Sequence, residues 1–265
     1  MASISARVSE TRPFYADHAD VYDLLVTDPV DAWVSAVHER LVARGWSSAL
    51  VLDAGCGTGR HAAALVAEGH RVDLADASAG LLAQAFARNL TSRALHVDLC
   101  TFTSDTAYQA IMCRGVLNDM TTDDERDAVL CAFADALADD GLLFLDVRET
   151  EGSRRRADGV PRHRTIDLGE RGVLQFTNTV TWESGRIHVL EDFELQRAGT
   201  AAERRVFEFA MRPWSEEELR DRLGAAGFDR VEIGPGVGRA TGDRLFVAAR
   251  RVPRAVDAED PEETA

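Results

Sequence analysis

Three closely spaced glycines, Gly55, Gly57 and Gly59, follow an apolar run at residues 49–52 and precede a helix-like stretch at residues 61–68. Glycine has no Cβ, so the backbone of such a turn can approach a ligand within van der Waals distance. A dinucleotide-binding turn would place its third glycine one residue later than this chain does. The spacing therefore predicts a ligand-binding turn of another kind between a strand and a helix.

Acidic residues stand where three successive strands are expected to end, at Asp53, Asp76 and Asp98. The carboxyl ends of parallel strands meet at one edge of a sheet, where such folds bind their ligands. Asp76 could accept hydrogen bonds from two ribose hydroxyls. Asp98 could accept one from an exocyclic amino group such as that of adenine. Three acids, with Arg60 as the nearby cation, favour a nucleoside that carries an amine and a positive centre over a pyrophosphate.

The composition excludes several other chemistries. The chain has 265 residues, with 45 acids against 30 bases and a formal net charge of −15, so a nucleic-acid partner is not expected. It contains no lysine, which excludes Schiff-base catalysis and the lysine-dependent phosphate loop. The four cysteines show no metal-binding spacing, so no metal site is expected. Without a signal peptide or an apolar span, we expect a cytoplasmic protein that does not enter a membrane.

Short apolar segments alternate with helical patterns over most of the chain, which predicts parallel strands covered by helices on both faces. An α/β fold is therefore expected, with a sheet similar to that of Rossmann proteins. The expected helical stretches lie at residues 14–44, with a break at 28–29, and at 61–68, 79–89, 123–138 and 215–226. The expected strands of this sheet lie at residues 49–52, 72–75, 94–97, 110–113, 142–147, 228–233 and 245–249.

Residues 151–212 interrupt this alternation. Four consecutive strand patterns at residues 165–168, 173–182, 187–195 and 205–211 predict an antiparallel insertion after the fifth strand, covering the substrate cleft. The predicted organisation has four parts. They are an N-terminal helical lid at 1–48, a cofactor-binding core at 49–150 and 213–250, the insertion at 151–212, and an acidic, disordered tail at 251–265.

These segments resemble the class I S-adenosylmethionine-dependent methyltransferases. The resemblance rests on D-A-G-C-G-T-G-R-H at residues 53–61, the acidic strand end at 76–78, the Asp-Leu pair at 98–99 and the exit of the fourth strand at 113–117. It returns in the S-E-E-E-L and A-A-G-F patterns within residues 213–247. It implies a seven-stranded sheet whose last strand is antiparallel. Leu74, where relatives often carry glycine, departs from the family pattern and affects local packing alone.

The same resemblance implies S-adenosylmethionine as cofactor and S-adenosylhomocysteine as product. The methionine part would lie over residues 55–59, the ribose on Asp76 and the adenine near residues 98–99. The implied cofactor-binding residues are Asp53, Gly55, Cys56, Gly57, Gly59, Arg60, Asp76, Ala77, Asp98, Leu99, Cys113 and Arg114.

Candidate catalytic residues come from the first helical stretch and from the exit of the fourth strand. Tyr15 and Tyr22 are seven residues apart, which on one helix would put both rings on the same face with His18 between them. The pattern resembles the lid helix of glycine and aminosugar N-methyltransferases. Asn118, with Asp119 beside it, could hold an amine or a hydroxyl. The alternatives are that the tyrosines serve packing and that Asn118 caps a helix.

The interpretation we carry forward is a methyltransferase that methylates a nitrogen of a small molecule by in-line displacement. An arginine-rich run at residues 154–164 suggests a substrate with an anionic group, although a solvated loop would show the same pattern. Alternatives are an O-methyltransferase of a small metabolite and a non-catalytic S-adenosylmethionine-binding protein. The all-arginine, alanine-rich composition is associated with secondary metabolism in high-GC bacteria, and we expect a monomer or homodimer.

Overall fold

The computed structural model describes residues 3–88, 93–239 and 241–253. Its centre is a seven-stranded sheet in the order β10-β11-β5-β4-β1-β2-β3, in which β1 to β5 are parallel and β11 runs antiparallel to both of its neighbours. The fold predicted for the core, including the antiparallel last strand, is confirmed. The strands are β1 (Leu50–Ala54), β2 (Arg71–Asp76), β3 (Ala94–His96), β4 (Tyr108–Arg114), β5 (Leu137–Arg148), β10 (Phe228–Pro235) and β11 (Arg244–Arg251).

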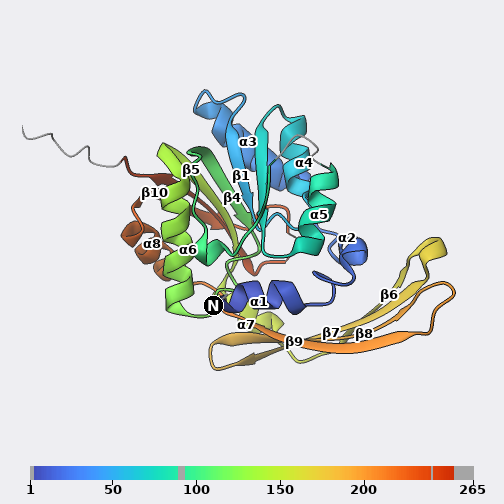
Figure 1. The fold of residues 1–265 in the computed structure, drawn as a ribbon. Helices are drawn as coiled ribbons and strands as arrows, with labels where there is room; N and C mark the ends of the chain where they lie inside the picture. Colours follow the sequence, from blue (N-terminus) through green and yellow to red (C-terminus); the bar gives the residue numbers. More distant parts are fainter. Residues whose placement is uncertain (1–2, 89–92, 240, 254–265) are drawn as a thin grey trace, which may run out of the picture.

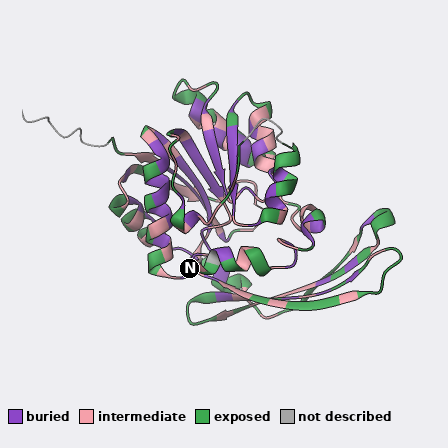
Figure 2. Cartoon of the chain, in the orientation of Figure 1, coloured by how far each residue is buried: buried purple, intermediate pink, exposed green. Residues whose placement is uncertain are grey.

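Helices cover both faces of this sheet (Figure 1). One face packs against α3 (Asp31–Ala43), α4 (Arg60–Ala67) and α5 (Ala79–Arg88). The other packs against α6 (Asp123–Ala136) and α8 (Glu216–Ala225). The central strands are almost wholly buried (Figure 2), which is why their sequences are continuous apolar runs rather than alternating ones.

A second, four-stranded antiparallel sheet follows β5, as predicted, after the short helix α7 (Thr150–Arg156). Its strands are β6 (Arg162–Asp167), β7 (Val173–Glu183), β8 (Arg186–Gln196) and β9 (Glu203–Met211), with the turn η3 (Gly169–Arg171) between the first two. It curves away from the core below α1 in Figure 1. Along β8, buried and more exposed residues alternate from Ile187 to Leu195, so one face of this sheet is covered.

The N-terminal segment, which we define as residues 3–28, differs from the single helix expected over residues 14–28. It contains α1 (Ile4–Thr11), turns over residues 13–18, the 3₁₀ turn η1 (Ala19–Val21) and the one-turn helix α2 (Tyr22–Leu25). The prediction that Tyr15 and His18 lie on one helix with Tyr22 is therefore wrong. The predicted break at residues 28–29 is confirmed, because α3 begins at Asp31.

Helix α1 was not predicted, because residues 4–11 are mostly polar and form a helix through contacts distant in sequence. The Ser3 side chain caps the helix by accepting a hydrogen bond from Ala6 N. The Ser3 amide and hydroxyl both donate to the Asp98 carboxylate, at 2.8 and 3.0 Å. These contacts link the start of the chain to the end of β3.

The last part of the described chain contains helix α8 and strand β11. The Ser215 side chain caps α8 by accepting from Glu218 N, and the Glu218 carboxylate pairs with Arg126, Arg212 and Arg222. Strand β11 extends to Arg251, and residues 254–265 of the predicted acidic tail lie outside the described residues. Within the described part of the chain, no helix is both long enough and apolar enough to cross a membrane.

Candidate functional site

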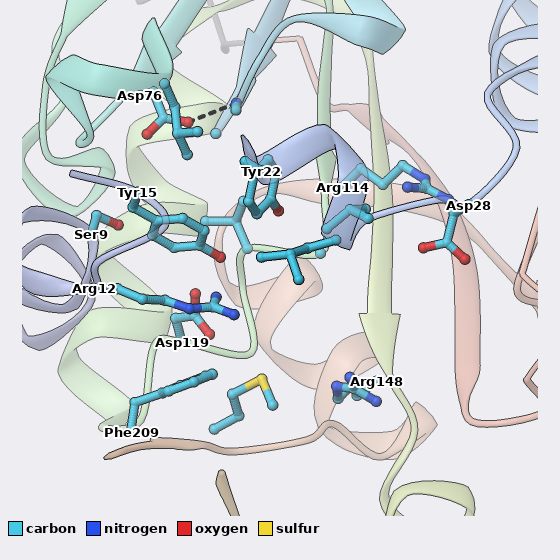
Figure 3. A pocket seen from close by; sticks show the side chains of 18 of the residues that line it. Ser9, Arg12, Tyr15, Tyr22, Asp28, Asp76, Arg114, Asp119, Arg148 and Phe209 are labelled. Carbon is cyan, nitrogen blue, oxygen red and sulfur yellow. Dashed lines mark hydrogen bonds between the residues drawn. The ribbon is translucent and has the colours of Figure 1, made fainter. Parts of the chain in front are cut away.

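A cavity of about 510 Å³ opens at the carboxyl edge of the seven-stranded sheet. The ends of β1, β2 and β4 form one side of the cavity, and the N-terminal segment forms another. A third side is the face of strands β7 to β9 that is turned toward the core. Figure 3 shows side chains from all three regions directed toward this space. A site at this edge is expected for a parallel α/β sheet, and here the second sheet encloses it.

The three glycines of the turn after β1 all have positive φ angles, of 72° at Gly55, 55° at Gly57 and 74° at Gly59. Their roles differ. A Cβ on Gly55 would lie 2.3 Å from Val116 Cγ2, so this glycine is needed for packing. A Cβ on Gly57 would have Tyr22 Cε1 as its nearest neighbour, at 3.9 Å. Gly57 thus keeps its backbone open toward the cavity, where a ligand can approach it.

Asp76 is held in place by backbone N–H groups from the glycine turn and from the residues that follow it. Its carboxylate accepts hydrogen bonds from Gly57 N and Ser78 N, both at 2.8 Å. Burial raises the pKa of Asp76, although these backbone donors oppose the shift. Each carboxylate oxygen has further lone-pair capacity, so two ribose hydroxyls could still donate to it. The structure therefore supplies the acceptor that the sequence suggested at the end of β2.

Asp53 lies beside Asp76 and is also buried. Burial and the neighbouring Asp76 raise the pKa of Asp53 to about 7, and Arg114 opposes this shift. Its Oδ2 atom has no hydrogen-bond partner among the described residues. Buried polar atoms are nearly always paired in folded proteins, so an unpaired acceptor at the cavity wall suits a ligand that brings a donor or a positive charge.

Asp98 also lines the cavity, but protein groups already use its carboxylate. Both oxygens accept from Ser3, and Oδ1 also accepts from Cys100 N at 3.0 Å, which caps the turn η2 (Leu99–Thr101). The predicted adenine contact would therefore have to share Asp98 with the start of α1.

The cavity brings together most of the predicted site residues. The predicted residues that line it are Tyr15, Tyr22, Asp53, Gly55, Cys56, Gly57, Arg60, Asp76, Ala77, Asp98, Leu99 and Arg114. Arg60 also anchors the N-terminal segment, since its guanidinium donates to the carbonyls of Val26 and Asp28 at 2.7 and 3.0 Å.

Four predicted residues do not line the cavity. Gly59 is the N-cap residue of α4, and Cys113 is fully buried in the core. Asn118 is also fully buried, and its side-chain oxygen accepts from Arg148 N at 2.7 Å, which ties the exits of β4 and β5 together. His18 faces the second sheet, where its Nε2 lies 3.3 Å from Glu203 Oε1. Their roles in binding or catalysis stay predictions without a geometric basis.

Tyr15 and Tyr22 meet in the cavity although they do not share a helix. Their ring centroids are 5.4 Å apart in an edge-on arrangement. Burial raises the pKa of both phenols above the usual value of about 10, so both keep their protons at neutral pH. Figure 3 shows the Tyr15 hydroxyl directed toward Arg12 and Asp119.

Two residues that the sequence did not single out, Arg12 and Glu191, form an ion pair beside these rings, in which Glu191 is buried and the Arg12 side chain is 16% exposed. The pair joins the end of α1 to β8 at 2.5 Å. The Arg12 guanidinium also lies 4.4 Å from the Tyr15 ring centroid and 4.6 Å from that of Phe209. The alternation along β8 could have identified Glu191, because it is a charged residue on the same buried face of the strand as Val189.

Asp119 is the acid closest in sequence to Asn118, and the structure places it, rather than Asn118, at the cavity wall. Burial raises the pKa of Asp119 to about 6, while Arg12, Arg148 and Arg244 oppose the shift. Its charge adds to burial in raising the pKa of Tyr15, and Figure 3 shows the carboxylate on the side to which the Tyr15 hydroxyl points. An accessible carboxylate with this pKa can accept a proton at neutral pH.

Several arginines surround the far side of the cavity. Arg239 and Arg244 both pair with the buried Asp146, at 3.1 and 2.9 Å, and Arg148 pairs with Asp243 at 2.5 Å. Arg114 and Arg148 have guanidinium nitrogens without a hydrogen-bond partner among the described residues. These donors leave room for an acceptor from a ligand. In the part of the chain that the structure describes, no group of three or more metal-binding side chains occurs.

Comparisons with known proteins agree with this geometry. Residues 51–141 match the family model described as a methyltransferase domain. The glycine/sarcosine N-methyltransferase of Halorhodospira halochloris is 36% identical over 109 residues, covering 38% of this chain and 41% of that protein. The chain spans about half the length, or less, of the curated relatives it matches.

Solved structures of methyltransferases share the fold over nearly the whole chain. The sugar N-methyltransferase KedS8 from Streptoalloteichus sp. superposes with a TM-score of 0.77 at 22% identity, covering 88% of this chain and 92% of that one. The amino pentose methyltransferase CalS10 from Micromonospora echinaspora, solved with S-adenosylmethionine bound, gives a TM-score of 0.71 at 24% identity and covers 88% and 96%. The predicted resemblance is confirmed: residues 51–141 match a methyltransferase domain, and the chain has the fold of solved methyltransferases, one of which was solved with S-adenosylmethionine bound.

Proposed function

We propose that this protein transfers a methyl group from S-adenosylmethionine to a nitrogen atom of a small-molecule substrate. The methyltransferase domain and the shared fold support the reaction class, and relatives described as N-methyltransferases are consistent with the target. The observation that carries the choice of nitrogen is Asp119, a half-buried carboxylate in the same cavity as the glycine turn. The proposal has three parts: cofactor binding, proton removal and substrate recognition.

The residues present fit the cofactor. Gly57 leaves space for the methionine part, and each carboxylate oxygen of Asp76 accepts one backbone hydrogen bond and can still accept from a ribose hydroxyl. The unpaired Oδ2 of Asp53 supplies a buried acceptor next to them. When bound, S-adenosylmethionine would supply a methyl group on a positively charged sulfur. The nitrogen lone pair of the substrate would bond to the methyl carbon in line as the carbon–sulfur bond breaks.

Asp119 would remove the proton that an amine carries at neutral pH. An ammonium group has no free lone pair, so it must lose a proton before it can attack. A carboxylate whose pKa is raised to about 6 is ionised at pH 7 and is a better proton acceptor than an ordinary aspartate. It also attracts a cationic amine and repels a phenolate or carboxylate, which favours N-methylation over O-methylation.

Tyr15, Tyr22 and Arg12 would shape the space in which the transfer occurs. The two rings and the guanidinium above Tyr15 form a continuous wall next to Gly57. Such a wall excludes water and limits the directions from which an amine can approach, which is the main contribution that methyl transfer requires of the protein.

We also propose that the substrate carries an anionic group. From the predicted arginine run, Arg156 and Arg162 line the cavity, with Arg148 beside them. Arg162 pairs with Asp158 and Arg156 shares Asp243 with Arg148, and Arg148 Nε is a buried donor without a partner among the described residues. A carboxylate or phosphate of the substrate could accept from it.

The test is a methylation assay over amines, phenols and carboxylic acids, followed by pH profiles of the best substrate. With an amine whose pKa is near that of lysine, about 10.4, we expect kcat/KM to be flat between about pH 6 and pH 10 and to fall tenfold per unit below pH 6, as Asp119 takes up its proton. Asp119→Asn should lower kcat/KM about 100- to 10,000-fold at pH 7. Its kcat/KM should then rise tenfold per pH unit, because only the free amine can react.

Affinity for S-adenosylhomocysteine, measured by calorimetry, serves as the control and should be the same in wild type and Asp119→Asn. A phenol or a carboxylic acid as the best substrate would overturn the choice of nitrogen. An unchanged pH profile in the variant would remove Asp119 from the reaction. Cofactor binding without transfer to any compound of the panel would favour a non-catalytic binding protein.

A further inference from the structure

The inner face of the second sheet, which is the face turned toward the core, has two halves divided by Glu191. On one side, Phe176 and Phe193 pack against Phe14 and other apolar residues of the N-terminal segment. This half is covered by the protein itself. The register places all of these sheet residues in line with Glu191 on the same face.

The other half of the inner face is a separate apolar cluster. Its buried residues are Ile187, Val189 and Met211, with Val180 and Phe209 packed against them. All five line the cavity that holds the glycine turn. We call these five residues the apolar floor.

The apolar floor lies beyond the charged groups as seen from the cofactor side. Figure 3 shows Asp76 and Tyr22 at one end of the cavity, Arg12 and Asp119 in the middle and Phe209 past them. The Phe209 ring is in contact with the Arg12 guanidinium, so the floor begins where the charged groups end. The order along the cavity is therefore glycine turn, tyrosines, charged groups and apolar floor.

We propose that the substrate carries an apolar group, aliphatic or aromatic, which binds on the apolar floor. This inference rests on the proposed function. In an in-line transfer, the nitrogen attacks from the side opposite the sulfur, so its substituents point away from the cofactor. In this cavity that direction leads past Asp119 to the floor. An apolar group buried there is favoured by about 0.8 kcal/mol per methylene group, whereas a polyhydroxylated group would lose hydrogen bonds to water.

The outer face of the same strand provides a matched control. Leu190 follows Val189 directly, but its side chain is 36% exposed on the face turned away from the core. Val189→Thr and Leu190→Thr both place a hydroxyl on β8, and only the first of them alters the cavity. Met211→Gln is a second variant of the floor, should Val189→Thr fail to fold.

The experiment measures binding of straight-chain primary amines, from propylamine to hexylamine, to the full-length protein loaded with S-adenosylhomocysteine. We expect the dissociation constant to fall about three- to fourfold with each added methylene group. Val189→Thr and Met211→Gln should weaken hexylamine binding about tenfold and change propylamine binding less. Leu190→Thr should match wild type for every amine.

A dissociation constant independent of chain length would overturn the apolar floor, as would equal effects of Val189→Thr and Leu190→Thr. Turnover of these amines, and of glycine and amino sugars, with S-adenosylmethionine is measured in parallel and tests the proposed function. Chain-length-dependent binding without any methylated product supports the floor and overturns N-methylation. Efficient methylation of glycine or amino sugars without chain-length dependence keeps N-methylation and overturns the floor.

Discussion

The cofactor side and the substrate side of the cavity are built from different kinds of contacts. On the cofactor side, Asp76 is positioned by backbone N–H groups of Gly57 and Ser78, which lie 19 and 2 residues away in the chain. On the substrate side, Arg12 is positioned by a side chain 179 residues away, Glu191. The Asp76 contacts are made around one β–α–β unit, formed by β1, α4 and β2, whereas the second side requires the N-terminal segment and the second sheet to meet.

Three further contacts between the N-terminal segment and the second sheet also join side chains to residues far away in the chain. Arg205 pairs with Asp17 at 2.8 Å, Arg197 pairs with Asp20 at 2.9 Å, and Arg164 donates to the Leu25 carbonyl. Exposed ion pairs of this kind contribute about 0–1 kcal/mol each. Single side-chain substitutions can therefore change how the substrate side is held together. The cofactor side depends instead on the backbone conformation of the glycine turn.

The largest expected effect is on the cofactor side. Gly57→Val should reduce affinity for S-adenosylhomocysteine more than about 100-fold, because the side chain fills the open space and the residue needs a φ of 55°. Calorimetry measures the loss. Gly185→Val is the matched control, since Gly185 has a φ of 77° in the turn between β7 and β8 and no atoms crowd it. Equal affinity in the Gly57 variant would place the cofactor elsewhere.

An intermediate effect is expected at the junction of the N-terminal segment and β8. Arg12→Met should lower the free energy of unfolding by about 2–4 kcal/mol, because Glu191 is left buried without a counter-charge. The double variant Arg12→Met/Glu191→Leu should recover part of this loss. Urea unfolding measures both. Affinity of the folded variants for S-adenosylhomocysteine should change less than about threefold. A larger loss of affinity would show that the cofactor side and the substrate side are not separable.

The smallest expected effect lies where the two sides meet. Tyr22→Phe keeps the ring next to Gly57 and removes only the hydroxyl, so turnover should fall about two- to tenfold, as for a hydrogen bond worth roughly 0.5–1.5 kcal/mol. Cofactor affinity should stay the same. Tyr108→Phe is the control, since the Tyr108 hydroxyl donates to Asp73 outside the cavity. Turnover equal to wild type in Tyr22→Phe would make that residue a packing group.

The sequence predicted the parts of the site that depend on local structure. Glycines at Gly55 and Gly57, an acid at the end of β2 and continuous apolar strands are visible without knowledge of distant contacts, and the parallel sheet then brings the strand ends together. The antiparallel insertion was also predictable from its alternation. The helix proposed for Tyr15 and His18 was wrong, because apolar residues in tight turns can show the same three- and four-residue spacing as a helix.

The sequence by itself therefore determined the strands, the glycine turn and the acids at the strand ends, since the conformation of each strand, turn and helix follows largely from neighbouring residues and their alternation implies a parallel sheet. Only the tertiary structure decided which side chains face the substrate. It turned His18 away toward Glu203, buried Asn118 behind Asp119, and paired Arg12 with Glu191 across 179 residues. Such choices depend on how the N-terminal segment packs between two sheets, and no local pattern encodes that packing.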